Sequence, residues 1–204
     1  MNGDNEQYFS DPPAFMNQPA ESLAALDDHL RGMLQDYARR EPSHAALAAE
    51  FGTLIDEAED PFCRERLAGH FTASCWLVSA DGQRLLLTHH RKLQRWLQLG
   101  GHADGDRDLA RVALKEAGEE SGLTGLVLDD PAIFDLDKHW IPARKDVPGH
   151  WHYDVRFVIR AVGGEAFVLS EESLDLAWRP VAEVAADPAS DESMQRMANR
   201  WLAR

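Results

Sequence analysis

Residues 100–123 read GGHADGDRDLARVALKEAGEESGL, and the interpretation of the whole chain starts from this stretch. Asp106 or Asp108 can accept hydrogen bonds from the first turn of a helix, so either is a suitable N-cap. Gly122 can adopt the left-handed conformation in which helices commonly end. The pattern therefore predicts a helix that runs to about Ser121 and follows a loop containing glycines.

Three glutamates of this predicted helix share one face. Glu116, Glu119 and Glu120 stand at relative positions i, i+3 and i+4, where like charges repel. Mg²⁺ or Mn²⁺ would compensate that repulsion, because both ions prefer oxygen ligands. Gly100 and Gly101 have no side chains, so their carbonyls can approach the same ion. A solvated acidic helix face is the alternative, but it leaves the glycines unexplained.

The spacing of residues 101–123 resembles the Nudix box. That motif is a glycine, five residues, a glutamate, seven residues, and then Arg-Glu-apolar-x-Glu-Glu-x-Gly-apolar. Counting from Gly101, its second half falls on KEAGEESGL at 115–123, with the three glutamates and the last glycine in register. The resemblance covers roughly residues 68–188.

Two positions depart from the motif. Arg107 stands where the box has its first glutamate, and Lys115 stands where it has arginine. The resemblance implies that the residues at these two positions form a structural ion pair between the loop and the helix. Arg107 and Lys115 are both cations and cannot form it. One of three nearby carboxylates could hold Lys115 instead. These are Asp104, Asp106 and Asp108.

The resemblance implies both a fold and an activity. The expected fold is α+β, a Nudix-type αβα sandwich with a mixed sheet. The expected activity is Mg²⁺-dependent or Mn²⁺-dependent hydrolysis of a diphosphate linkage in a nucleoside diphosphate joined to another group, with water as nucleophile. Glu116 and Glu120 would ligate the metal, Glu119 would act as ligand or base, and Gly100 would offer its carbonyl.

The resemblance leaves the general base open between two kinds of residue. Nudix enzymes use either a glutamate of the box or an acidic residue on a later loop. Glu119 and Glu120 are the preferred candidates, and Glu171 and Glu172 are the candidates on the later loop.

Substrate contacts are expected outside the box. Arg91 and Arg95 concentrate positive charge just before it and could hold phosphates, although a solvated hairpin end explains them equally well. His150 and His152 share a strand face, and His139 could approach them from a neighbouring strand. A zinc site lacks an evident fourth ligand, so we interpret His139 and His152 as substrate contacts.

The flanking sequence predicts an irregular mixture of strands and helices, which favours α+β. Residues 71–79 and 84–88 read as a hairpin, and 96–99 as a short strand. Further strands are expected at 126–128, 134–141, 152–162 and 175–178. A closing helix is expected over 191–202. Asp154 and Arg156 share a strand face and are expected to pair with each other.

Residues 1–60 are interpreted as an N-terminal helical extension, and residues 61–204 as the Nudix domain. Apolar residues recur at helical spacing over 21–40, and a second helix is expected after Pro42, with Ser43 as its N-cap. These helices could cover the sheet or a second subunit. We hypothesise that the leucine-bearing face of 21–40 makes a homodimer contact.

Charge and composition exclude several classes of function. With 21 basic and 35 acidic residues the net charge is −14, which disfavours long DNA or RNA as a partner. Cys63 and Cys75 form no disulfide framework and are read as buried apolar residues. Neither a secretory signal nor a membrane-spanning stretch is recognisable, so a cytoplasmic location is expected.

Two other functions remain open. The first is a Nudix-fold module that senses a nucleotide without cutting it, suggested by Arg107 and Lys115. The intact glutamates argue against this reading. The second is an isomerase similar to isopentenyl diphosphate isomerase. That chemistry needs a cysteine near the glycine loop, whereas Cys75 lies in a preceding strand.

Overall fold

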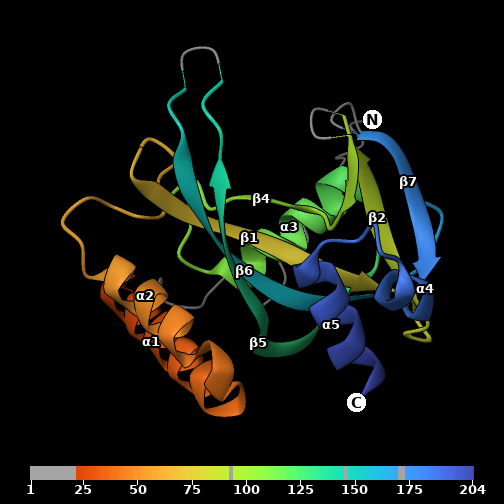
Figure 1. Cartoon of the computed structure of the whole chain (residues 1–204), viewed down its shortest axis with the longest axis horizontal. Helices are drawn as coiled ribbons and strands as arrows, with labels where there is room; N and C mark the ends of the chain where they lie inside the picture. Colours follow the sequence, from red (N-terminus) through yellow and green to blue (C-terminus); the bar gives the residue numbers. More distant parts are fainter. Residues whose placement is uncertain (1–21, 92–93, 145–146, 170–172) are drawn as a thin grey trace, which may run out of the picture.

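The computed structural model describes residues 22–91, 94–144, 147–169 and 173–204 (Figure 1). The helices are α1 (Leu23–Arg40), α2 (Ala45–Ile55), α3 (Leu109–Ser121), α4 (Val181–Ala186) and α5 (Glu192–Leu202). The strands are β1 (Gly69–Val78), β2 (Arg84–His90), β3 (Arg95–Leu97), β4 (Gly100–His102), β5 (Leu126–Ile141), β6 (His150–Ala161) and β7 (Ser173–Pro180). Among the described residues, no helix has the length and apolar character needed to cross a bilayer.

The strands form one mixed sheet, as the sequence predicts. Their order is β3-β2-β1-β6-β5, while β4 pairs with β1 and β7 pairs with β2. Strands β1 and β6 run parallel, and the other named pairs are antiparallel. The predicted turn between β1 and β2 contains Gly82, whose φ of 71° suits glycine.

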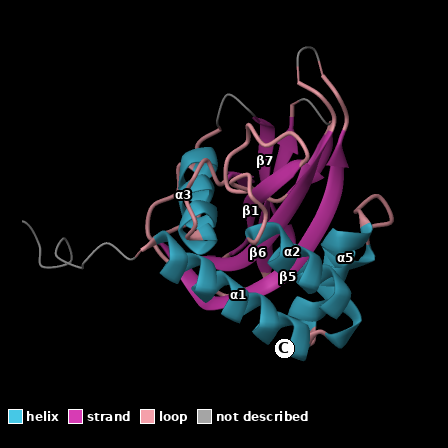
Figure 2. Ribbon diagram, turned by 90° about the vertical axis from the view of Figure 1, so that its left-hand side faces the viewer, coloured by secondary structure: helices cyan, strands magenta, loops and turns pink. Residues whose placement is uncertain are grey.

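Helices cover both faces of the sheet, with α3 and α5 on opposite sides (Figure 2). Side chains alternate along β1 because successive residues of a strand point to opposite faces. Phe71, Ala73 and Cys75 pack in the core shared with α1, α2 and α3. Trp76 and Val78 pack in the core shared with α4 and α5. The αβα sandwich is therefore confirmed.

The N-terminal helices belong to the first of these cores. Ser22 caps α1 by accepting a hydrogen bond from the backbone N–H of Ala25 at 3.2 Å. Leu30 and Leu34 of α1 and Phe51 of α2 are buried. Leu30 and Leu34 therefore pack within their own chain, whereas Leu23 of the same helix is 60% exposed, and the homodimer contact stays a prediction. The division at residue 61 stays a prediction.

Two local predictions are corrected. Ser43 is not the N-cap of α2, because Pro42–His44 forms a short 3₁₀ helix and His44 precedes α2 without a side-chain cap. The strands expected at 126–128 and 134–141 form one continuous strand, β5. Its register with β6 shifts on either side of Asp130. Because β5 is an edge strand, it accommodates Pro131 within this irregular stretch.

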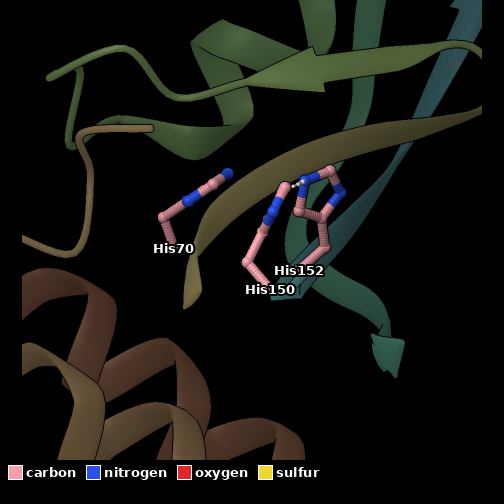
Figure 3. Close-up of side chains that lie close together, drawn as sticks. All are labelled: His70, His150 and His152. Carbon is pink, nitrogen blue, oxygen red and sulfur yellow. Dashed lines mark hydrogen bonds between the residues drawn. The ribbon is translucent and has the colours of Figure 1, made fainter. Parts of the chain in front are cut away.

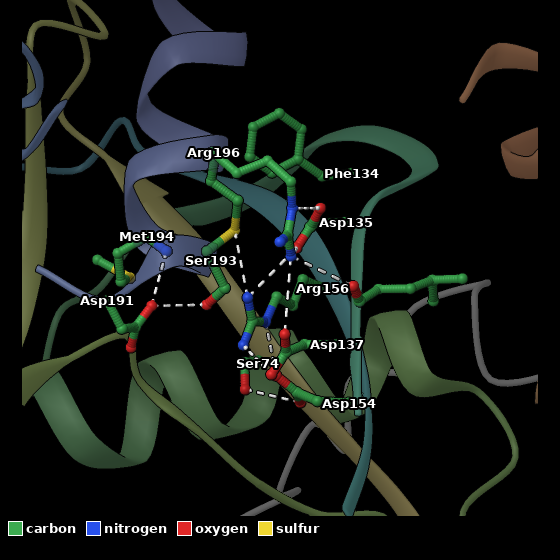
Figure 4. A network of polar contacts seen from close by, with 12 residues as sticks. Ser74, Phe134, Asp135, Asp137, Asp154, Arg156, Asp191, Ser193, Met194 and Arg196 are labelled. Carbon is green, nitrogen blue, oxygen red and sulfur yellow. Dashed lines mark hydrogen bonds and ion pairs between the residues drawn. The ribbon is translucent and has the colours of Figure 1, made fainter. Parts of the chain in front are cut away.

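A group of buried and half-buried charges joins α5 to the sheet, and we call it the acid–arginine network (Figure 4). Its members are Asp135, Asp137, Asp154, Arg156, Arg196 and Arg200. The expected pair is present, with Arg156 Nε 2.7 Å from Asp154 Oδ2. Asp135 is fully buried and binds guanidinium groups of Arg156 at 3.3 Å and Arg196 at 2.7 Å.

Candidate functional site

The predicted helix is present as α3, and both of its ends follow the sequence. Asp108 is the N-cap, and its side chain accepts a hydrogen bond from the Arg111 N–H at 3.0 Å. Gly122 ends the helix with a φ of 66°. These caps fix the start and the end of α3 and therefore the direction in which its glutamates project.

Two of the three glutamates meet the glycine loop. The Glu120 Oε1 atom accepts a hydrogen bond from the Gly100 N–H at 2.9 Å. A Cβ atom at Gly101 would lie only 2.5 Å from the Glu116 carboxyl carbon, so a side chain there would displace this carboxylate. The structure thus brings Gly100, Gly101, Glu116 and Glu120 together, although they are far apart along the chain.

Glu119 lies on the exposed part of α3. Its side chain is 60% exposed, and its Oε2 atom is 3.0 Å from Lys115 Nζ. The same ammonium group is 3.4 Å from Glu116 Oε1. Lys115 is therefore held by glutamates of its own helix, and hydrogen bonding to Glu119 raises its pKa.

The expectation that an aspartate holds Lys115 was wrong. Asp106 accepts hydrogen bonds from Arg111, and Asp104 accepts them from Arg64. Asp108 caps α3. All three aspartates are occupied by local partners, because arginines and the helix N-terminus compete for them.

Arg107 has a different role from the glutamate that it replaces in the motif. Its side chain is 13% exposed and forms ion pairs with Asp27 of α1 at 2.9 Å and with Asp60 at 3.3 Å. Its guanidinium also lies over the Phe62 ring, 4.7 Å from the centroid. Arg107 therefore ties the loop before α3 to the N-terminal helices.

The carboxylates next to the glycine loop fit a hard divalent cation. Burial raises the pKa of Glu116, while the charge of Lys115 opposes this shift. The Glu116 carboxylate is half-buried and fills the space that a Cβ atom at Gly101 would need. Its charged form is therefore disfavoured unless a cation compensates it. Oxygen donors of this kind are the ligands preferred by Mg²⁺ and Mn²⁺.

The predicted substrate-binding residues lie on different parts of the sheet. Arg91 follows β2 and Arg95 begins β3, at one end of the strand order. His139 of β5 and His152 of β6 are register partners near the other end, with ring centroids 5.4 Å apart. Glu172 and its neighbour Glu171 lie outside the described residues.

Two histidines that the sequence analysis missed lie beside His152. The ring centroids of His70 in β1 and His102 in β4 are 5.0 and 5.1 Å from that of His152. The signal for His102 was its place directly after the two glycines. His70 becomes a neighbour only through the parallel pairing of β1 with β6, which no local pattern specifies.

Cys75 gives the isomerase alternative no support. Its side chain is fully buried in β1, and burial raises the pKa of its thiol well above the ordinary value. A buried, protonated thiol is a poor acid–base or nucleophilic group.

Comparisons with known proteins agree with this architecture. A family model described as the NUDIX domain matches residues 69–200. The fold is similar to that of an Ap4A hydrolase from C. elegans, with 16% identity, TM-score 0.50, and coverage of 65% of this chain and 95% of that one. A MutT protein from Methanosarcina mazei Go1 is 17% identical, with TM-score 0.51 and coverage of 72% of this chain and 97% of that one. The E. coli dihydroneopterin triphosphate pyrophosphohydrolase is 15% identical, with TM-score 0.50 and coverage of 66% of this chain and 96% of that one. No curated protein matches the chain.

Proposed function

Because this chain belongs to the Nudix domain family, we propose that it is a metal-dependent hydrolase of a nucleoside diphosphate joined to another group. Water would add to one phosphorus of the diphosphate, and the bridging P–O bond would break. The products would be two phosphate-bearing molecules, and the proton released by the water would pass to a carboxylate.

The observation that carries this proposal is the contact of Glu116 and Glu120 with the glycine loop. Gly100 donates to Glu120, and Gly101 leaves space that the Glu116 carboxylate fills. These two glutamates and the Gly100 carbonyl are the proposed ligands of Mg²⁺ or Mn²⁺. The bound ion would supply positive charge to the diphosphate and to the leaving oxygen.

The remaining roles follow from position and chemistry. Glu120 is the first choice for the proton acceptor, because Glu119 is exposed and paired with Lys115. Glu119 and, on the later loop, Glu172 are the other candidates. Arg91 and Arg95 would contact phosphates. His139 and His152, which the sequence analysis interpreted as substrate contacts, lie on the face of the sheet opposite to Gly101 and Glu116, so we do not assign them to the substrate.

The test is phosphate release after phosphatase coupling, with and without Mg²⁺ or Mn²⁺. The panel contains ADP-ribose, sugar nucleotides, dinucleoside polyphosphates and nucleoside triphosphates. Wild type is compared with Glu120→Gln and with Glu192→Gln, a control that changes an exposed glutamate of α5. We expect metal-dependent turnover that Glu120→Gln lowers by about 100-fold or more and Glu192→Gln leaves unchanged.

Other outcomes would contradict the proposal. Turnover that needs no divalent metal, or that Glu120→Gln leaves intact, would separate the activity from the carboxylate site. Tight binding of a nucleotide without metal and without cleavage would instead favour the nucleotide-sensing module suggested by Arg107 and Lys115.

A further inference from the structure

Five imidazole rings gather on one face of the sheet, and we call them the histidine cluster. They are His70 of β1, His102 of β4, His139 of β5, and His150 and His152 of β6. The register of the sheet brings them together, since His70 pairs with His152 and His152 pairs with His139. Figure 3 shows His70, His150 and His152 side by side, from β1 and β6.

Three of these rings have nitrogens close enough to share an ion. One nitrogen each from His70, His150 and His152 lies within 4.8 Å of the other two. The Nε2 atoms of His150 and His152 are 3.2 Å apart. In a tetrahedral zinc site, Zn–N bonds of about 2.0–2.1 Å put two nitrogens about 3.3 Å apart. One pair already has this spacing, and the His70 nitrogen lies within 4.8 Å of both atoms of that pair.

Backbone carbonyls fix two of the rings in the tautomer that a metal requires. His70 Nδ1 is 3.1 Å from the Arg66 carbonyl oxygen, and His150 Nδ1 is 2.9 Å from that of Pro148. A carbonyl oxygen only accepts, so both Nδ1 atoms carry the proton and both Nε2 atoms keep a lone pair. This is the usual support of metal-binding histidines, whose second nitrogen donates to a carbonyl or carboxylate.

The Nε2 atom of His70 is buried and unsatisfied. His70 is 2% exposed, and this nitrogen has no hydrogen-bond partner among the described residues. A buried acceptor without a partner is costly and rare in folded proteins. A metal ion in the cluster would take up its lone pair and so explain why the atom is left unsatisfied.

The cluster is suited to a cation that prefers nitrogen ligands. Uncharged imidazole binds zinc and similar transition metals, whereas Mg²⁺ prefers oxygen. His102, His139 and His152 are each half-buried rather than sealed, which leaves access from solvent.

The histidine cluster and the carboxylates of α3 face opposite sides of the sheet. Gly101 contacts Glu116, and its register partner on β1 is Ala73, which packs in the core shared with α3. His102 is the next residue of β4 and therefore points to the other face. The two groups of side chains are thus separate.

We propose that the histidine cluster is a second metal site, which binds one divalent transition-metal ion of the zinc class through His70, His150 and His152. A ligand from solvent would take the fourth position. An ion bound there would link β1 to β6. The site goes beyond the proposed hydrolysis and does not depend on it.

The test measures metal binding by the full chain, prepared without a histidine tag and stripped with a chelator. Excess Mg²⁺ is present throughout, so that the carboxylates of α3 do not compete for the added ion. Co²⁺ is added first, because its visible absorption reports tetrahedral nitrogen coordination. Zn²⁺ is then titrated against a chromogenic chelator. Wild type is compared with His152→Gln, His150→Gln and Glu120→Gln, and with His29→Gln, which changes an exposed histidine of α1.

We expect one tightly bound Zn²⁺ per chain and a tetrahedral Co²⁺ spectrum for wild type, His29→Gln and Glu120→Gln. His152→Gln and His150→Gln should each weaken zinc binding by more than about 100-fold. That loss is larger than the one usually seen when a residue that only hydrogen-bonds to a metal ligand is replaced. Circular dichroism checks that each variant is folded. If only one of the two variants His152→Gln and His150→Gln folds, that variant alone is enough to test the proposal. Absent zinc binding, unchanged binding in a folded histidine variant, or loss of binding in Glu120→Gln would overturn the proposal.

Discussion

The acid–arginine network and the histidine cluster are neighbours on the same face of β5 and β6, but they differ in how well their polar atoms are satisfied. Asp137 and Asp154 of the network stand two residues from His139 and His152 of the cluster. The Asp135 carboxylate binds arginines from both β6 and α5. By contrast, within the part of the chain that the structure describes, no group hydrogen-bonds to the buried Nε2 atom of His70.

The difference follows from which elements cover each region. Helix α5 lies over the network and contributes Arg196 and Arg200, so the buried carboxylates are neutralised within the chain. Above the histidines, the side chain of His152 remains partly exposed. We infer that a complete network serves the architecture, whereas an incomplete group of donors is where a ligand can bind.

Breaking the network should have the largest effect. Arg156→Met removes the cation that faces Asp135, Asp137 and Asp154, and leaves buried negative charge uncompensated. We expect the free energy of unfolding in urea to fall by about 3–5 kcal/mol. Arg160→Met, on the same strand but pairing with Asp129 near the surface, is the control and should cost under about 1 kcal/mol. Equal losses of unfolding free energy in the two variants would show that the network contributes no more than a surface ion pair.

A smaller effect is expected where the network reaches α1. The Tyr37 hydroxyl is 3.4 Å from Asp135 Oδ1 and 2.8 Å from His44 Nδ1, so Tyr37→Phe should lower the unfolding free energy by about 1 kcal/mol at neutral pH. Burial, and then the charge of Asp135, raise the pKa of Tyr37 to about 12.

This shift gives the alkaline side of the stability curve a definite sign. The folded state favours the protonated phenol, so its contribution is complete below the ordinary tyrosine pKa of about 10 and is lost as the pH rises toward 12. Urea unfolding of wild type and Tyr37→Phe across this range measures the difference. The gap between them should narrow above pH 10, and a constant gap would contradict the assignment.

The smallest effect is expected in the histidine cluster. His70→Leu, studied without added metal, loses one hydrogen bond to the Arg66 carbonyl but also removes an unsatisfied buried nitrogen. These effects oppose each other, so the unfolding free energy should change by less than about 1 kcal/mol. A loss as large as that of Arg156→Met would mean that the histidines are a structural network in their own right.

Short-range sequence signals predicted the helices and strands well, whereas contacts between residues far apart in the sequence could not be predicted from them. The cap at Asp108 and the end at Gly122 follow from short-range hydrogen bonding, and the glutamate spacing places Glu116 and Glu120 on a common face. The contact of that face with Gly100 and Gly101 followed from the resemblance to a known motif. The partners of Lys115 were predicted wrongly, because nearby arginines compete for the same aspartates.

One local turn and several long-range contacts explain the other differences. Ser43 has cap chemistry, but the Pro42 turn closes as a 3₁₀ helix and shifts the start of α2. The sequence left open whether α1 covers the sheet or a second subunit, because the core that buries Leu30 and Leu34 is assembled from distant segments. The sequence analysis missed His70 because the parallel pairing of β1 with β6, which places it beside His152, has no short-range signature in the sequence.

The most direct test is anomalous diffraction from crystals of the full chain grown with Mn²⁺ and Zn²⁺, with data collected at both absorption edges. The account predicts a manganese peak between Glu116, Glu120 and the Gly100 carbonyl. It also predicts a separate zinc peak between His70, His150 and His152, on the other face of the sheet. Zinc found only at the glutamates, or no peak among the histidines, would contradict the division of this molecule into two metal-binding regions.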